Sequence, residues 1–91
     1  MHVKTKSGFE AEVRENLGND YRYLKALRSF REPDNDLRML ELPELCELTL
    51  GKDGARKLEQ HLAQEDGSVP MDRVMEELFE IWGASKQTKN S

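Results

Sequence analysis

Residues 70–82, PMDRVMEELFEIW, carry the most regular helical pattern in the chain. On a wheel of about 100° per residue, the apolar side chains share an arc of roughly 160°, and charged side chains fill the remainder. Gly67 and Ser68 interrupt the preceding segment, and Pro70 suits the first position of a helix. A stripe of this width is buried in a folded protein, against either the same chain or a partner. The stripe comprises Met71, Val74, Met75, Leu78, Phe79, Ile81 and Trp82.

The composition indicates one small domain. The chain has 91 residues, of which 36% are hydrophobic and 35% charged, so its core is modest and well-matched helices or self-association must stabilise it. The net charge of −4 disfavours nucleic acid, whose phosphates require a basic surface. The sequence has no apolar run of about 18 residues, and its first residues do not resemble a signal peptide. We therefore expect a soluble intracellular protein that binds neither nucleic acid nor membrane.

The N-terminal segment alternates apolar and polar residues on both sides of Ser7 and Gly8. This alternation predicts a short β-hairpin over about residues 2–14. A lone hairpin is only marginally stable in water, so we expect it to lie against the helices through Phe9 and Val13. The stretch 9–16 also fits the start of a helix, and the sequence leaves that alternative open.

A second helical pattern follows the hairpin. Asp20 is placed to cap a helix that runs to about Arg31 and has apolar side chains along one side. Its Arg and Lys residues raise the possibility of a phosphate-binding face. Because acidic residues flank the segment and the chain is acidic, a solvated face is the preferred interpretation.

Leucines at helical spacing fill the middle of the chain. Pro43 removes one hydrogen bond from any continuous helix, so it predicts a kink and a new helix over 43–50. Gly51 and Gly54 predict the end of that helix and the start of another over 54–64.

Together these patterns predict a mainly α fold. We expect a single helical domain over residues 1–84, with four to five helices and the short N-terminal β-hairpin. Residues 85–91 have little to bury and should form a flexible tail. Cys46, the single cysteine, lies within an apolar helical pattern and should be a small core residue instead of a reactive thiol.

The sequence offers no recognisable catalytic or metal-binding motif. If Gly67 is aligned with the sixth position of an EF-hand loop, Arg73 occupies the twelfth position, where calcium needs a carboxylate. His2 and His61 lie far apart, and neither has a second ligand at a zinc-site spacing. No nucleophile has a base beside it. We therefore expect no enzyme activity, no metal and no cofactor. The carboxylates on the opposite side of this helix, Glu76, Glu77 and Glu80, are predicted to lie on a solvent face.

The order of segments resembles a known family. The matching stretches are K-T-K-S-G-F-E-x-E-V over 4–13, L-P-E-L-x-E-L-x-L-G over 42–51, K-L-x-x-H-L-x-x-E-D-G-x-V-P over 57–70, and E-E-L-x-E-I-W over 76–82. They cover most of the chain and are similar to the small tail assembly chaperones of long-tailed bacteriophages and prophages of Gram-positive bacteria. These motifs carry turns and core spacing.

The resemblance implies a mostly helical, self-associating protein of the host cytoplasm that is absent from the mature virion. It implies two partners, the long tape-measure protein, which the chaperone keeps soluble, and the tail tube protein, which polymerises around it. The resemblance also implies a longer form made by a ribosomal frameshift in many members.

The stripe supplies the candidate partner-binding residues. Adaptable methionines beside aromatic anchors suit a groove that accepts an amphipathic helix, and Trp82 stands where little chain remains to cover it. The same side chains also fit a core or a homo-oligomer interface. An alternative function is a small phage- or prophage-encoded regulatory protein that acts by protein–protein interaction. The candidate residues are Met71, Met75, Phe79 and Trp82.

Overall fold

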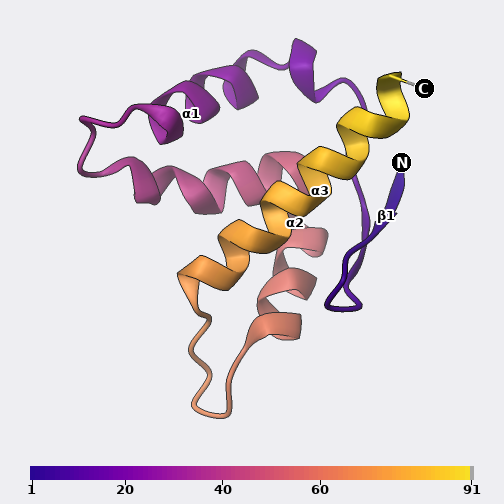
Figure 1. Cartoon of the computed structure of the whole chain (residues 1–91). Coiled ribbons are helices and arrows are strands. Elements are labelled where there is room, and N and C mark those ends of the chain that lie inside the picture. The colour runs from indigo at the N-terminus through magenta and orange to yellow at the C-terminus, as the bar shows by residue number, and fades with distance from the viewer. Residues whose placement is uncertain (91) are drawn as a thin grey trace.

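The computed structural model describes the backbone of residues 1–90 and the side chains of residues 1–85. Within this part the protein is mainly helical, with a two-stranded antiparallel hairpin at its N-terminus, as predicted (Figure 1). Two 3₁₀ turns, η1 and η2, precede the first two α-helices. The elements are β1 (His2–Lys4), β2 (Glu10–Glu12), η1 (Leu17–Asn19), α1 (Tyr21–Arg31), η2 (Arg38–Glu41), α2 (Leu42–Leu62) and α3 (Met71–Asn90).

The hairpin forms around the predicted turn. Val3 of β1 pairs with Ala11 of β2, and the Gly8 N–H donates to the Thr5 carbonyl oxygen at 3.0 Å. Gly8 has a φ of 93°, a conformation that glycine adopts without strain. Phe9 and Val13 are buried against the helices, which confirms that the hairpin packs through them.

Asp20 caps α1, as the sequence predicts. Its carboxylate accepts the Arg22 backbone N–H at 2.9 Å and lies 2.8 Å from the Arg22 Nη2. This charge-assisted contact with Arg22 lowers the pKa of the Asp20 carboxyl to about 2. The cap therefore stays ionised, and satisfies an otherwise unpaired helical N–H, throughout the physiological pH range.

The middle of the chain differs from the prediction. Pro43 stands in the first turn of α2 as expected, but the helix does not end at Gly51. Gly51 takes a non-helical conformation, with φ 79° and ψ 167°, and the helix resumes directly after it, so the two halves of α2 run in different directions (Figure 1). The segments predicted as separate helices over 43–50 and 54–64 thus form one bent element. The predicted count of four to five helices is wrong, because residues 1–90 form three α-helices.

Substituting Gly51 with alanine should destabilise the fold, because this backbone conformation is almost restricted to glycine. We expect a loss of about 1–3 kcal/mol in the free energy of unfolding, measured by urea denaturation. Lys52→Ala, at the next and exposed position, is the control and should stay close to the wild type. Equal stability of Gly51→Ala and the control would show that the bend is not strained.

The core lies where α3 crosses the bend of α2 (Figure 1). α3 contributes Leu78 and Ile81, and α2 contributes Leu45 and Leu58; all four side chains are almost fully buried. The stripe of residues 70–82 therefore finds a large part of its burial within this chain. The remaining buried apolar side chains of the core cluster are Val3, Phe9, Ala11, Val13, Ala26, Phe30, Leu42, Cys46, Leu50 and Ala55.

Glu77 contradicts the prediction of a fully solvated acidic face, because only 4% of this residue is exposed. Its Oε1 atom accepts hydrogen bonds from the hydroxyls of Thr5 at 2.7 Å and Ser7 at 3.0 Å. One turn later, the Glu80 Oε2 atom accepts the Lys6 backbone N–H at 2.7 Å. The hairpin turn thus docks on α3 through two carboxylates, a tertiary contact that helical periodicity does not encode.

The backbone of α3 continues through Gly83 to Asn90. The side chains of 86–90 and the whole of residue 91 lie outside the described part, so the flexible tail over 85–91 and the domain boundary at residue 84 stay predictions. None of the helices in residues 1–90 has the length and apolar character needed to span a bilayer.

Candidate protein-binding cleft

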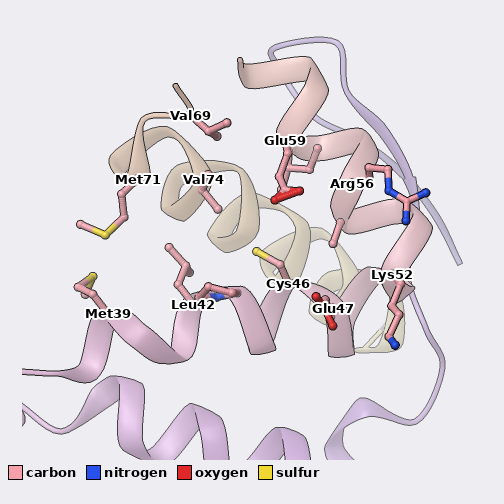
Figure 2. Close-up of a pocket in the computed structure, with 13 residues that line it drawn as sticks. Met39, Leu42, Cys46, Glu47, Lys52, Arg56, Glu59, Val69, Met71 and Val74 are labelled. Atoms are coloured by element: carbon pink, nitrogen blue, oxygen red, sulfur yellow. The ribbon is translucent and has the colours of Figure 1, made fainter. Parts of the chain in front are cut away.

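A cleft opens between the two halves of α2 and the start of α3 (Figure 2). Its volume is about 570 Å³, which falls within the range of about 300–1,000 Å³ typical of ligand-binding pockets. The bend at Gly51 creates the cleft by directing the second half of α2 away from the first. The cleft is lined by Met39, Leu42, Pro43, Cys46, Glu47, Lys52, Ala55, Arg56, Leu58, Glu59, Val69, Met71 and Val74.

One end of the cleft is apolar. Figure 2 shows Met39, from η2, facing Met71, from the first turn of α3, with Leu42 and Val74 close to them. Met71 is half exposed, whereas Leu42 is buried. Because methionine is flexible and polarizable, such a pair of side chains adapts to apolar groups of different shape.

The other end of the cleft is charged but balanced. Glu47 and Glu59 stand near Lys52 and Arg56, and all four residues are exposed (Figure 2). Arg56 also forms a 3.6 Å ion pair with Asp53. A balanced set of charges does not select a strongly anionic or cationic small molecule. It resembles the polar rim that surrounds the apolar centre of a protein interface.

Cys46 lies in the cleft but is not a nucleophile. Burial raises the pKa of its thiol to about 12, and the nearby Glu59 and Glu47 carboxylates act in the same direction. The thiol is therefore protonated at neutral pH, and the reactive thiolate is scarce. The side chain acts as a small hydrophobic residue, which agrees with its predicted place in the core.

The residues described in the structure contain no cluster of three or more histidine, cysteine or carboxylate side chains that could hold a metal ion.

Of the four candidate residues of the stripe, only Met71 is part of the cleft lining. Met71 lines the cleft, and Met75 is partly buried against the core. Phe79 is 49% exposed and lies away from the cleft lining, with its ring centroid 6.1 Å from that of Phe30. The structure thus brings Met71 together with Met39, which the helical stripe alone did not identify.

Trp82 is engaged inside the molecule. Its indole N–H donates to the Thr49 hydroxyl at 3.0 Å, and its ring meets the edge of Tyr23 at a centroid distance of 5.9 Å. The Phe79 ring also packs beside Trp82, with the two ring centroids 5.8 Å apart. α1 and α2 therefore cover part of Trp82, which is half-buried. Its role as a partner anchor stays a prediction.

Further apolar side chains are exposed beside Met39 in the sequence. Leu37 is 66% exposed and Leu40 is 71% exposed, on either side of a residue that lines the cleft. The sequence carries a sign of this surface, because Leu37 and Leu40 continue the helical spacing of the leucines ahead of Pro43, outside the span of α2. Exposed large apolar side chains that gather in one region indicate an interaction surface.

Comparisons of the chain with protein-family models, with curated proteins and with solved structures found no match. The geometry of the cleft is therefore the basis for a functional interpretation. An adaptable apolar surface with a balanced polar rim suits the reversible binding of an apolar polypeptide segment.

Proposed function

We propose that this protein is a non-catalytic tail assembly chaperone of a long-tailed bacteriophage or prophage. It binds the tape-measure protein in the host cytoplasm, keeps it soluble while the tail tube protein polymerises around it, and does not remain in the mature virion. The observation that carries this proposal is the cleft in which Met39 and Met71 face each other (Figure 2). The resemblance of the segment order to this class of chaperones agrees with such a role.

The client in this proposal is an amphipathic helix. Apolar side chains at positions i, i+3 or i+4, and i+7 would enter the cleft between Met39 and Met71, in the way that helices dock in hydrophobic grooves. Glu47, Lys52, Arg56 and Glu59 would then contact polar side chains at the edge of the client helix. Tolerance is required because a long helical client presents many similar but non-identical segments.

The cleft also suits release. A chaperone must leave the client when the tube protein covers it, so its affinity for each segment has to stay moderate. A pocket of about 570 Å³ accepts only a few side chains at a time, and exposed charges at its edge contribute little net binding energy. Many chaperone molecules, each bound weakly to one segment of the client and linked by self-association, would keep the client soluble through avidity.

The test is co-expression with fragments of the tape-measure protein, which this proposal expects a neighbouring gene to encode as a long helical chain. The wild type should hold such a fragment in the soluble fraction, whereas Met71→Asp should weaken capture about 30-fold or more, as loss of about 2 kcal/mol from a central anchor does. Met71 is half exposed, so this change leaves the core intact. Ala63→Asp, at an exposed residue that lies outside the cleft lining and outside α1, is the control and should capture the fragment normally.

Two results would contradict the proposal. One is an amount of soluble fragment that is the same with and without the wild-type chain, which would show that the chain has no chaperone activity on this client. The other is equal capture by Met71→Asp and Ala63→Asp, which would exclude the cleft as the binding surface. Neighbouring genes that lack both a tube protein and a long helical protein would favour the alternative of a small regulatory protein.

A further inference from the structure

α1 has a charge opposite to that of the rest of the molecule. The helix contains four basic residues and no acidic residue. Since the whole chain has a net charge of −4, the residues outside α1 together carry −8. All four basic residues are exposed, so the helix presents a positive surface on an otherwise negative protein. They are Arg22, Lys25, Arg28 and Arg31.

Apolar side chains form a second row beside the basic row. Tyr21, Leu24, Leu27 and Phe30 repeat at a spacing of three, as the basic residues do, and rows of this spacing cross a helix at about 45°. The row passes from solvent into the core, since Tyr21 is 75% exposed, Leu24 is 46% exposed and Phe30 is only 6% exposed. We call the part of both rows that solvent reaches the α1 surface; it comprises Tyr21, Arg22, Leu24, Lys25, Leu27, Arg28 and Arg31.

The basic side chains at the end of the α1 surface are available to a partner. Arg22 is bound to Asp20, and Lys25 lies over the Tyr21 ring with its Nζ 5.9 Å from the centroid. Among the side chains of residues 1–85, none forms an ion pair with Arg28 or Arg31. These two guanidinium groups line a shallow depression of about 400 Å³ together with Leu24, Leu27 and Glu32.

We propose that the α1 surface binds an acidic amphipathic helix of another protein. An apolar side chain of that helix would enter the depression between Leu24 and Leu27, and its carboxylates would meet Arg28 and Arg31. Guanidinium groups bind carboxylates through two parallel hydrogen bonds, which gives such a contact direction as well as attraction. The positive surface would also steer an acidic partner to α1 and away from the negative remainder of the molecule.

Charge favours a protein partner over an anionic membrane or a nucleic acid. Both of these present extended negative surfaces, which the −8 of the remaining chain repels. The buried end of the apolar row also prevents α1 from inserting its apolar side into a bilayer.

A second copy of this chain is also a poorer partner. The most acidic helix available is the first part of α3, where the Glu76 carboxylate pairs with Arg73 at 3.7 Å and the Glu80 carboxylate accepts the Lys6 N–H. Glu77, beside them, is buried under the hairpin turn, so two of the four acids on this part of α3, Glu77 and Glu80, are held inside their own molecule. The α1 surface shares no lining residue with the cleft, so this inference does not depend on the proposed chaperone function.

The test uses a fluorescein-labelled synthetic helix with leucines on one face and glutamates beside them, followed by fluorescence anisotropy. A matched peptide with lysine in place of each glutamate is the peptide control. The acidic peptide should bind the full chain, with an affinity that falls as salt rises, and the lysine peptide should not bind. Arg28→Gln/Arg31→Gln should weaken binding about tenfold or more, because it removes two charge-assisted contacts.

Lys4→Gln/Lys6→Gln is the matched control, since it removes the same charge from exposed side chains of the hairpin. It should bind like the wild type, and both double variants should keep the wild-type melting temperature. If both double variants bound the acidic peptide equally weakly, net charge alone would explain the binding, and the proposal would be overturned. Tighter binding of phosphatidylglycerol vesicles or duplex DNA than of the acidic peptide would also overturn it, as would a dimer of the free chain that the arginine variant abolishes.

Discussion

Trp82→Ala should lower the melting temperature by about 10 °C or more. Trp82 joins all three helices, because it donates to Thr49 of α2, meets Tyr23 of α1 and lies beside Phe79 on α3. Truncation of a large aromatic side chain costs about 3 kcal/mol or more when it leaves a cavity. A domain of this size loses roughly 4–8 °C for each kcal/mol, and thermal unfolding followed by circular dichroism measures the change.

Two milder variants separate the hydrogen bond from the packing. Trp82→Phe keeps an aromatic ring but removes the indole donor from Thr49, which is fully buried, so a cost of about 1–2 kcal/mol is expected. Thr49→Val removes the acceptor. In the double variant the two losses should not add, because they report one bond. Additive losses would show that the bond contributes nothing and that packing alone explains the effect of Trp82→Ala.

The Trp82→Ala variant also tests the predicted role of Trp82 as a partner anchor. The fraction of Trp82→Ala that remains folded at low temperature can be assayed for capture of a tape-measure fragment and for oligomer mass. If that fraction captures the fragment and associates like the wild type, Trp82 acts only in the core. Reduced capture by a folded Trp82→Ala would support its place among the partner-binding residues.

Glu77→Ala should be the second large effect, with a loss of about 2–3 kcal/mol in the free energy of unfolding. This carboxylate accepts the hydroxyl hydrogen bonds of Thr5 and Ser7 across the contact between the hairpin and α3. Hydrogen bonds to a charged group contribute about 1.5–3 kcal/mol, and the buried Thr5 hydroxyl would lose its short 2.7 Å contact. Urea denaturation measures the loss.

The neighbouring acid provides the control. Glu76 is exposed and forms an exposed ion pair with Arg73, so Glu76→Ala should change stability by about 0.5 kcal/mol or less. Hydrogen exchange adds a local readout, because Glu77→Ala should speed the exchange of the Thr5 and Gly8 amides in the turn. Equal stability and unchanged turn exchange in both variants would show that Glu77 does not hold the hairpin on α3.

The local elements of the fold could be predicted from the sequence. A turn at Ser7-Gly8, a cap at Asp20 and a start at Pro43 depend on residues that are close in the chain, and the structure has all three. The helix count could not be predicted. A glycine that ends a helix and a glycine that bends one have the same local signature, and only the packing of α3 across the two halves of α2 distinguishes them.

The candidate site shows the same limit. Met71 could be selected from the stripe, because a wide apolar face on one helix is a periodic signal. Met39 and Glu77 could not, since each acquires its role from a segment distant in the sequence, Met39 from α3 and Glu77 from the hairpin turn. Glu77 in particular belongs to a charged run that periodicity assigns to solvent, and only two hydroxyl donors make its burial tolerable.

The four methionines allow the central claim, that the cleft binds a helical client, to be measured directly. The chain is labelled with ¹³C at the methionine methyl groups and titrated with a tape-measure fragment while the methyl NMR signals are recorded. Met39 and Met71 should shift together as the fragment binds, because both line the cleft, whereas Met1 lies on the hairpin and should not move. If the fragment binds while Met39 and Met71 keep their positions, the cleft is not the client site and the account is wrong.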